Sequence, residues 1–145
     1  MIAVAMTVSL LLAIPFRNPF AIKNNEIICD NEERINTSQI QMEPDRIIIN
    51  IDNTSISKYG NTSSMIPLIN ENSKGITVEP KSANDIKMGD IITYEFNGEL
   101  IVHRVINIGE DANGWYCIVK GDNTQVSDGK IRFEQIKSIL IGILY

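Results

Sequence analysis

The stretch IITYEFNGELIVHRVINI, residues 91–108, decides how this chain folds. Apolar and polar side chains alternate along Ile91–Phe96, which is typical of a strand with one face in a core. Asn97–Gly98 is a strong signal for a tight hairpin turn, and Glu99–Ile108 can form the returning strand. The stretch therefore predicts an antiparallel hairpin at the centre of the fold.

Further short strands are expected on both sides of this hairpin. β-branched and apolar residues predict them at 46–51, 75–80, 115–120 and 139–145, with shorter ones at 27–28 and 40–42. Residues 81–90 and 109–114 are expected to form loops, and residues 133–136 a short helical or turn element. Short strands separated by glycine and asparagine predict a mainly β domain.

Composition limits what the chain can do. Its 145 residues, 43% of them hydrophobic, are enough for one domain and a short appendage. A net charge of −5 without a cluster of cations argues against a nucleic-acid partner. Cys29 and Cys117 form no disulfide framework, although they could pair in an oxidising compartment. With a single histidine they cannot complete a zinc site, so no metal is expected.

The first sixteen residues, Met1–Phe16, carry no charge, and Arg17 and Lys23 follow them. A helix that crosses the hydrocarbon core needs about 20 apolar residues, so this run is short for that task. Three interpretations remain: a membrane anchor, a cleaved signal, or a buried helix or strand of the globular domain. The anchor is favoured, because the run lacks the basic start and the small-residue cleavage pattern of a secretory signal.

Three segments contain groups that could carry out nucleophilic hydrolysis: Thr62–Pro67 (TSSMIP), Leu100–Val105 (LIVHRV) and Lys120–Asp128 (KGDNTQVSD). Such chemistry needs a hydroxyl, a base with a pKa near the working pH, and a group that orients the base. Ser64, the only histidine His103 and a nearby aspartate can supply the three. Alternation along the strand predicts that His103 lies on an apolar face, where its ring needs a partner.

These three segments resemble the type I signal peptidase family, and more closely its archaeal and endoplasmic-reticulum branch than its bacterial one. In that family the serine of a Ser-Met-x-Pro segment is the nucleophile, and in this branch a histidine in a His-Arg-Val segment is the base. The resemblance runs from Thr62 to Tyr145. Three departures stand out: Ile66 replaces a negatively charged residue, Asn72–Gly75 replaces a Gly-Asp pair, and residues 24–61 are longer than the family's usual link from anchor to nucleophile.

The resemblance assigns a role to each candidate residue. Ser64 would attack the scissile carbonyl, and His103 would act as general base and then as general acid. Asp128 would orient His103, with Asp122 as the second choice. The backbone N–H of Ser64 and the hydroxyl of Thr62 would form the oxyanion hole. The structural alternatives are a turn serine, a histidine satisfied by a backbone carbonyl, an Asp122 that closes a turn, and an ordinary loop threonine.

The chain is expected to have three parts. Its residue pattern predicts a short N-terminal apolar helix as a membrane anchor at residues 1–21 and a polar lead-in with short strands at 22–61. The resemblance implies a signal-peptidase-like, β-rich catalytic domain at 62–145. The chain would be single-pass in the cell membrane. The charges after the apolar run favour a cytoplasmic domain, whereas the family places the catalytic domain outside the cytoplasm, which is the expected location.

The expected function is therefore a membrane-anchored serine endopeptidase that removes signal peptides from exported preproteins without a metal or organic cofactor. Its partners would be preproteins, the membrane and the protein-translocation machinery. One alternative is a relative of the self-cleaving LexA-type repressors, but those use lysine as base and carry a DNA-binding helix-turn-helix. The other is a non-catalytic, membrane-anchored β domain that binds or scaffolds an export complex. A catalytic pair would keep the Ser64 Oγ within about 3.5 Å of a His103 nitrogen, allowing for loose spacing without substrate, whereas a binding domain has no reason to keep them together.

Overall fold

A computed structural model describes residues 22–23, 26–27 and 33–145 of the chain, which divides into two compact units, Met1–Glu33 and Arg34–Tyr145. In the first unit, β1 (Ile22–Lys23) pairs antiparallel with β2 (Glu26–Ile27). The expected apolar helix and anchor, and Cys29, lie outside the described residues. Within the described part, no helix is both long and apolar enough to cross a bilayer.

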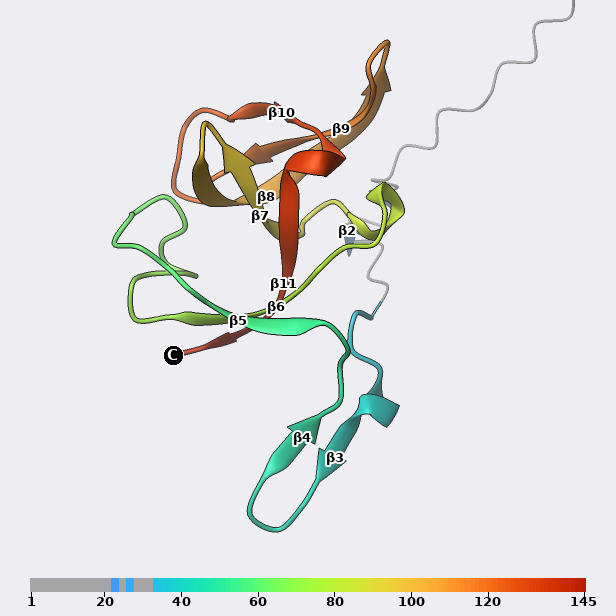
Figure 1. Cartoon of the computed structure of the whole chain (residues 1–145), viewed down its shortest axis with the longest axis vertical. Helices are drawn as coiled ribbons and strands as arrows, with labels where there is room; N and C mark the ends of the chain where they lie inside the picture. The colour runs from blue at the N-terminus through green and yellow to red at the C-terminus, as the bar shows by residue number, and fades with distance from the viewer. Residues whose placement is uncertain (1–21, 24–25, 28–32) are drawn as a thin grey trace, which may run out of the picture. The chain divides into compact units, whose positions relative to one another are not determined.

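The second unit is mainly β, which confirms that part of the predicted fold. Figure 1 shows its antiparallel seven-stranded sheet, in the order β10-β9-β8-β7-β11-β6-β5, and a separate β3–β4 hairpin. The strands are β3 (Ile40–Met42), β4 (Ile47–Ile49), β5 (Thr54–Lys58), β6 (Lys74–Val78), β7 (Ile91–Phe96), β8 (Glu99–Asp111), β9 (Gly114–Lys120), β10 (Gly129–Ile131) and β11 (Ile136–Leu144). Three single-turn 3₁₀ helices connect them: η1 (Thr37–Gln39), η2 (Ala83–Asp85) and η3 (Phe133–Gln135).

The β7–β8 hairpin forms as the sequence predicts. Asn97 (φ 52°) and Gly98 (φ 81°) both adopt the left-handed conformation that a type I′ turn requires. The prediction of a loop at 109–114 is wrong, because β8 continues to Asp111 and β9 begins at Gly114. Asp111 is a poor strand former by itself, but its carboxylate is held by the side chains of Lys130 and Arg132.

The sheet also takes in a strand from the segment expected as a lead-in. β5 has the polar sequence TSISK, and it forms the edge of the sheet beside β6. The Ser55 Oγ lies 2.8 Å from the Oγ1 of the buried Thr77, so hydroxyl contacts replace apolar packing between these strands. The compact unit therefore begins at Arg34, well before Thr62.

Two groups of buried side chains form the core. The larger one is built on β7, β8, β9, β10 and β11 and on the residue that follows η2, by Ile86, Ile92, Tyr94, Val105, Cys117, Val119, Ile131, Ile136 and Ile139. The smaller one consists of Met65, Ile69 and Ile91. Met65 follows Ser64 directly, so the segment that carries the candidate nucleophile is anchored in a core. Cys117 is a free thiol that is fully buried in the larger cluster.

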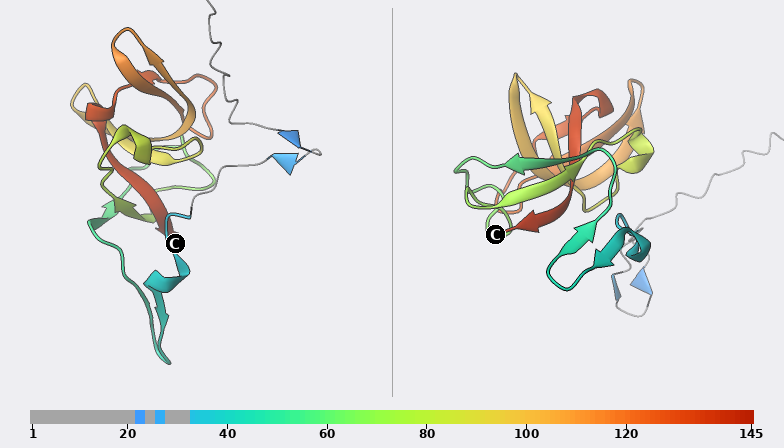
Figure 2. Two further views of the ribbon diagram at one scale, coloured as in Figure 1. Left: turned by 90° about the vertical axis from the view of Figure 1, so that its right-hand side faces the viewer. Right: turned by 60° about the horizontal axis from the view of Figure 1, so that its bottom comes forward.

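The β3–β4 hairpin extends away from the seven-stranded sheet (Figure 2). Its strand pairing puts Ile40 opposite Ile49 and Met42 opposite Ile47, so these four side chains share one face. All four are exposed, with Met42 at 81% and Ile47 at 64%. The hairpin therefore adds little to the core of the unit.

Candidate active site

The structure brings the serine segment against the loop that follows β9. The backbone oxygen of Ser64 accepts a 2.8 Å hydrogen bond from the N–H of Asn123. The Asn123 side chain donates to the backbone oxygen of Ser63 at 3.0 Å, and the N–H of Asp122 points at the Sδ of Met65 at 3.4 Å. Because the Met65 side chain is buried, these contacts and the core together define the position of Ser64.

His103 lies on β8 opposite Ile92 of β7, and it is 7% exposed. Its Nδ1 pairs with the Oδ2 of Asp128 and not with a backbone carbonyl. Since an ionised carboxylate only accepts hydrogen bonds, Nδ1 carries the proton and Nε2 is left as the basic nitrogen. The imidazole is thus held in the tautomer that a general base needs.

Gly121 lies between His103 and the serine segment. A Cβ added to this glycine would lie 2.9 Å from the His103 Nε2 and 2.7 Å from the backbone oxygen of Ser64. No side chain fits into that space, so Gly121 allows the loop to pass between the two. The basic nitrogen of His103 and the backbone of the candidate nucleophile therefore both lie beside Gly121.

Asp128 receives a second donor that the sequence analysis missed. The hydroxyl of the fully buried Tyr94 donates to the same Oδ2 at 2.6 Å. Burial raises the pKa of the Tyr94 hydroxyl well above its usual range, and its hydrogen bond to Asp128 adds to the shift. The sequence signal that could have identified Tyr94 is the hairpin turn at Asn97–Gly98. The register that it sets pairs Ile92 with His103, and it therefore places Tyr94 diagonally across from the histidine.

Asp122 has a different partner. Its carboxylate accepts two hydrogen bonds of 2.7 Å from the guanidinium of Arg104, one at Nε and one at a terminal nitrogen. This contact raises the pKa of Arg104. Arg104 follows His103 on β8 and therefore points to the opposite face of the strand. The structure thus brings Asp128, and not Asp122, to His103.

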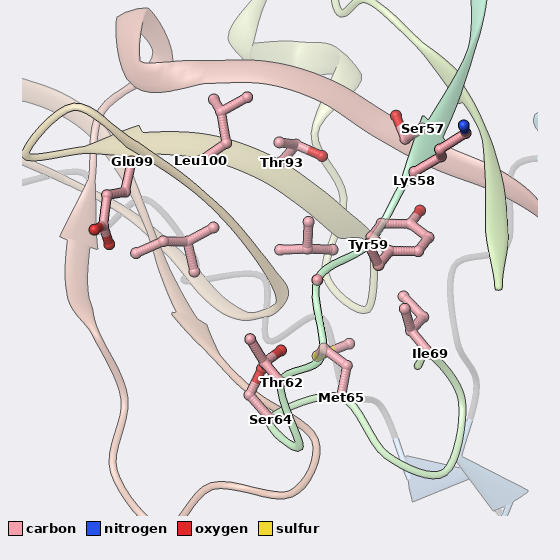
Figure 3. Close-up of a pocket in the computed structure, with 13 residues that line it drawn as sticks. Ser57, Lys58, Tyr59, Thr62, Ser64, Met65, Ile69, Thr93, Glu99 and Leu100 are labelled. Atoms are coloured by element: carbon pink, nitrogen blue, oxygen red, sulfur yellow. The ribbon is translucent and has the colours of Figure 1, made fainter. Parts of the chain in front are cut away.

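The hydroxyl of Ser64 has Thr62 as its neighbour. The Thr62 Oγ1 and the Ser64 Oγ are 3.5 Å apart, and Figure 3 shows the two side chains next to each other. No hydrogen bond joins the Ser64 Oγ to His103 in the structure, although both residues are within its described part. The histidine and the serine are therefore neighbours whose reacting atoms are not in hydrogen-bonding contact.

A pocket of about 510 Å³ opens beside Ser64. One wall is Ser57–Gly60 at the end of β5, and the other is Glu99–Val102 at the start of β8 (Figure 3). The remaining lining comes from the serine segment and its surroundings, namely Thr62, Ser64, Met65, Ile69 and Thr93. Two extended segments thus enclose a groove that has the candidate hydroxyls Thr62 and Ser64 in its lining.

The arrangement supplies a hydroxyl, an imidazole with one free nitrogen and a carboxylate that fixes the other. These groups are suited to acyl transfer by nucleophilic and general-base catalysis. Within the described ranges, no three His, Cys, Asp or Glu side chains lie together in a way that could hold a metal ion. In comparisons with known proteins, no family model, no curated protein and no solved structure matches the chain.

Proposed function

We propose that this chain is a membrane-anchored serine endopeptidase that cleaves signal peptides from exported preproteins. One observation carries the proposal: Asp128 pairs with the Nδ1 of a buried His103, and the free Nε2 lies beside Gly121, which also borders the backbone of Ser64. A histidine that only filled space would not need a carboxylate on one ring nitrogen and a glycine beside the other. The resemblance of the three sequence segments to signal peptidases supports the same chemistry.

The reaction follows from these groups. Ser64 Oγ attacks the scissile carbonyl while Nε2 of His103 takes its proton, and Asp128 stabilises the imidazolium that forms. The same nitrogen then returns the proton to the leaving amine. A water molecule then attacks the acyl-enzyme, with His103 again acting first as base and then as acid, and the Ser64 hydroxyl is released. The backbone N–H of Ser64 and the Thr62 hydroxyl would stabilise the oxyanion, since Thr62 is exposed at the groove beside Ser64.

The groove supports a peptide substrate in an extended conformation. Its two walls are extended backbone from β5 and β8, and its lining near Ser64 is apolar at Met65 and Ile69. A groove of about 510 Å³ has room for a few side chains and not for a folded domain. Signal peptides with small side chains before the cut are the substrates that the family resemblance implies.

The second candidate is a non-catalytic binding domain of an export complex. The observation that favours it is the contact of the Ser64 hydroxyl, which lies 3.5 Å from Thr62 and makes no hydrogen bond to His103. In peptidases without substrate this hydrogen bond is often long or badly aligned and tightens only in the complex. The contact by itself therefore does not decide between the two functions.

Cleavage of a preprotein in detergent or lipid vesicles by the full chain tests the proposal. The wild type is compared with Ser64→Ala, His103→Ala and the matched control Ser63→Ala, which removes a hydroxyl from the adjacent, exposed serine. Cleavage after the signal peptide by wild type and control, and its loss in the two site variants, is the expected result. Circular dichroism checks that all four chains are folded.

Two results would contradict the proposal. If no chain cleaves any of a range of preproteins, the binding function replaces it, and pull-down of preproteins by the wild type becomes the next measurement. If Ser64→Ala cleaves as fast as the wild type, another nucleophile must be responsible.

A further inference from the structure

Tyr94 combines complete burial with a single polar contact. Its ring is 0% exposed in the larger core cluster on β7, where a phenylalanine ring would fill the same space. A buried hydroxyl without a partner destabilises a protein by about 1–3 kcal/mol, so a tyrosine in this place needs an acceptor. That acceptor is the Oδ2 of Asp128, at 2.6 Å.

The hairpin register brings two donors to this one oxygen. Ile92 pairs with His103 and Tyr94 pairs with Ile101, so Tyr94 and His103 are diagonal neighbours on one face of the β7–β8 hairpin. Their ring centroids are 6.5 Å apart, and the ring planes are inclined by 53°. The hydroxyl and the Nδ1 proton therefore reach Asp128 from adjacent strands.

Asp128 itself is weakly held by its own segment. It lies in the loop before β10, its side chain is 30% exposed, and its backbone N–H donates to the backbone oxygen of Val119 at 2.9 Å. That bond fixes the main chain but leaves the carboxylate free to rotate. In the described part of the chain, the side chains that hydrogen-bond this carboxylate are Tyr94 and His103.

We propose that Tyr94 is a positioning residue of the Ser64–His103 site: its hydroxyl holds the Asp128 carboxylate in the orientation in which Oδ2 meets the Nδ1 proton of His103. The catalytic consequence rests on the proposed function, whereas the positioning itself does not. Without the hydroxyl, the half-exposed carboxylate can turn towards water, and the imidazole loses the contact that sets its tautomer and orientation.

The groups around Tyr94 leave it a neutral donor. Burial raises the pKa of the Cys117 thiol on β9 to about 11, so this neighbour carries no charge near neutral pH. Arg104 and Asp122 neutralise each other on the opposite face of β8. Since burial also raises the pKa of Tyr94, the hydroxyl keeps its proton throughout the range in which a peptidase would work.

NMR of the single histidine tests the inference on the full chain in detergent. Because His103 is the only histidine, ¹⁵N-histidine labelling reports one imidazole and its Nδ1 proton. The variants are Tyr94→Phe and the matched control Tyr116→Phe, whose ring lies 4.1 Å beneath the Lys130 ammonium and keeps that contact as phenylalanine. The expected result is that only Tyr94→Phe moves the Nδ1 proton resonance upfield and makes it exchange faster with water.

Kinetics provide a second readout where the chain cleaves a preprotein. Tyr94 does not line the groove, so KM should stay unchanged in Tyr94→Phe. The rate constant kcat should fall roughly tenfold, a part of the 10²–10⁴-fold that a positioned general base contributes. A merely structural role would lower the yield of folded protein without this separation of kcat from KM.

The outcomes separate the inference from the proposed function. An unchanged Nδ1 resonance in folded Tyr94→Phe overturns the inference, whether or not the chain cleaves. A shifted resonance in a chain that cleaves nothing supports the positioning and rejects the peptidase function. If Tyr94→Phe does not fold, the wild-type spectrum decides: a cross-relaxation peak between the Tyr94 hydroxyl proton and the Nδ1 proton supports the inference, and its absence overturns it.

Discussion

The backbone oxygen of Ser64 accepts a 2.8 Å hydrogen bond from the backbone N–H of Asn123. This bond joins the segment of the candidate nucleophile to the loop that packs beside the His103 Nε2. Asn123 is far from Ser64 in the chain, so the contact depends on the whole sheet being formed. The spacing between candidate nucleophile and candidate base is therefore controlled by the loop at Gly121–Asn123.

Gly121→Ala should lower the rate of cleavage about a hundredfold while leaving the sheet intact. The added Cβ would lie under 3.0 Å from both the Ser64 backbone oxygen and the His103 Nε2, so one of them must move. A displacement of about 1 Å in an active site costs about a hundredfold in rate. Preprotein cleavage measures the effect, and Gly142→Ala on β11 is the control, because a Cβ at Gly142 lies 3.4 Å from its nearest neighbour, the Ile76 side chain, and Gly142 does not line the groove. Full activity in Gly121→Ala would contradict the assignment of Nε2 as the catalytic nitrogen.

The two aspartates should differ sharply. Asp128→Asn removes the carboxylate that accepts from His103 and should lower kcat by about a thousandfold or more, as loss of the orienting aspartate does in known serine peptidases. Asp122→Asn weakens a partly exposed ion pair with Arg104, which is worth less than about 1 kcal/mol, and should keep most of the activity. Parallel rate measurements on the two variants check this. The reverse order would make Asp122 the orienting residue.

Met65 should support both stability and activity. Its side chain is 3% exposed, and it packs with Ile69 and Ile91 directly beside Ser64. Met65→Ala should lower the free energy of unfolding by about 2–5 kcal/mol through the cavity that it leaves. Urea denaturation gives this value. The neighbouring Ile66→Ala is the control, since Ile66 is 43% exposed and should change stability by less than about 0.5 kcal/mol.

The same isoleucine-to-alanine substitution should lower the free energy of unfolding much more in the core than in the β3–β4 hairpin. Ile139 on β11 is 1% exposed, and Ile139→Ala should cost about 2–5 kcal/mol of unfolding free energy. Ile47 on β4 is 64% exposed, and Ile47→Ala should cost less than about 0.5 kcal/mol. Chemical denaturation of both variants tests the contrast. A large loss for Ile47→Ala would mean that another part of the chain covers the hairpin.

Stability should fall in acid through Asp111. Hydrogen bonding from Lys130, with further help from the Asn113 N–H and Arg132, lowers the pKa of the Asp111 carboxyl from 3.8 to about 2. Because the folded value lies below the unfolded one, the contribution is complete above pH 3.8 and is lost as the pH falls towards about 2. Asp111→Asn should therefore flatten the pH dependence of unfolding in that window.

Urea denaturation at several pH values between 2 and 5 measures the free energy of unfolding of the wild type and Asp111→Asn by linear extrapolation. The control is Asp45→Asn at the tip of the β3–β4 hairpin, whose side chain is 75% exposed. Equal slopes for the wild type and Asp111→Asn would show that the ion pairs of Asp111 do not contribute to acid stability.

The sequence predicted β7 to the residue, because alternation along most of the strand and an Asn-Gly turn are local signals. It missed β5 and β10, which are short and largely polar or glycine-containing. Both lie at the edges of the sheet, and the partners that make them strands come from distant parts of the chain. Their own side chains give no period that distinguishes them from loops.

For the candidate site, the sequence singled out Ser64 and His103, and only the family resemblance put Asp128 before Asp122. Asp122 and Asp128 lie in one loop, and residue type does not distinguish them. Arg104 binds Asp122 on one face of β8, while His103 binds Asp128 on the other, so Asp128 is the carboxylate that reaches the imidazole. In the sequence, Tyr94 is one more residue of an alternating strand. Its role depends on the acceptor of its hydroxyl, Asp128, which the strand pattern does not reveal.

Local alternation and composition are enough to derive the mainly β class, the central hairpin and the residue types available for chemistry. The folded chain is needed to see which carboxylate meets the imidazole, that Tyr94 shares it, and that Gly121 borders both His103 and Ser64. These contacts depend on strand register and on the path of a loop around buried side chains, and both are set by packing between segments far apart in the chain.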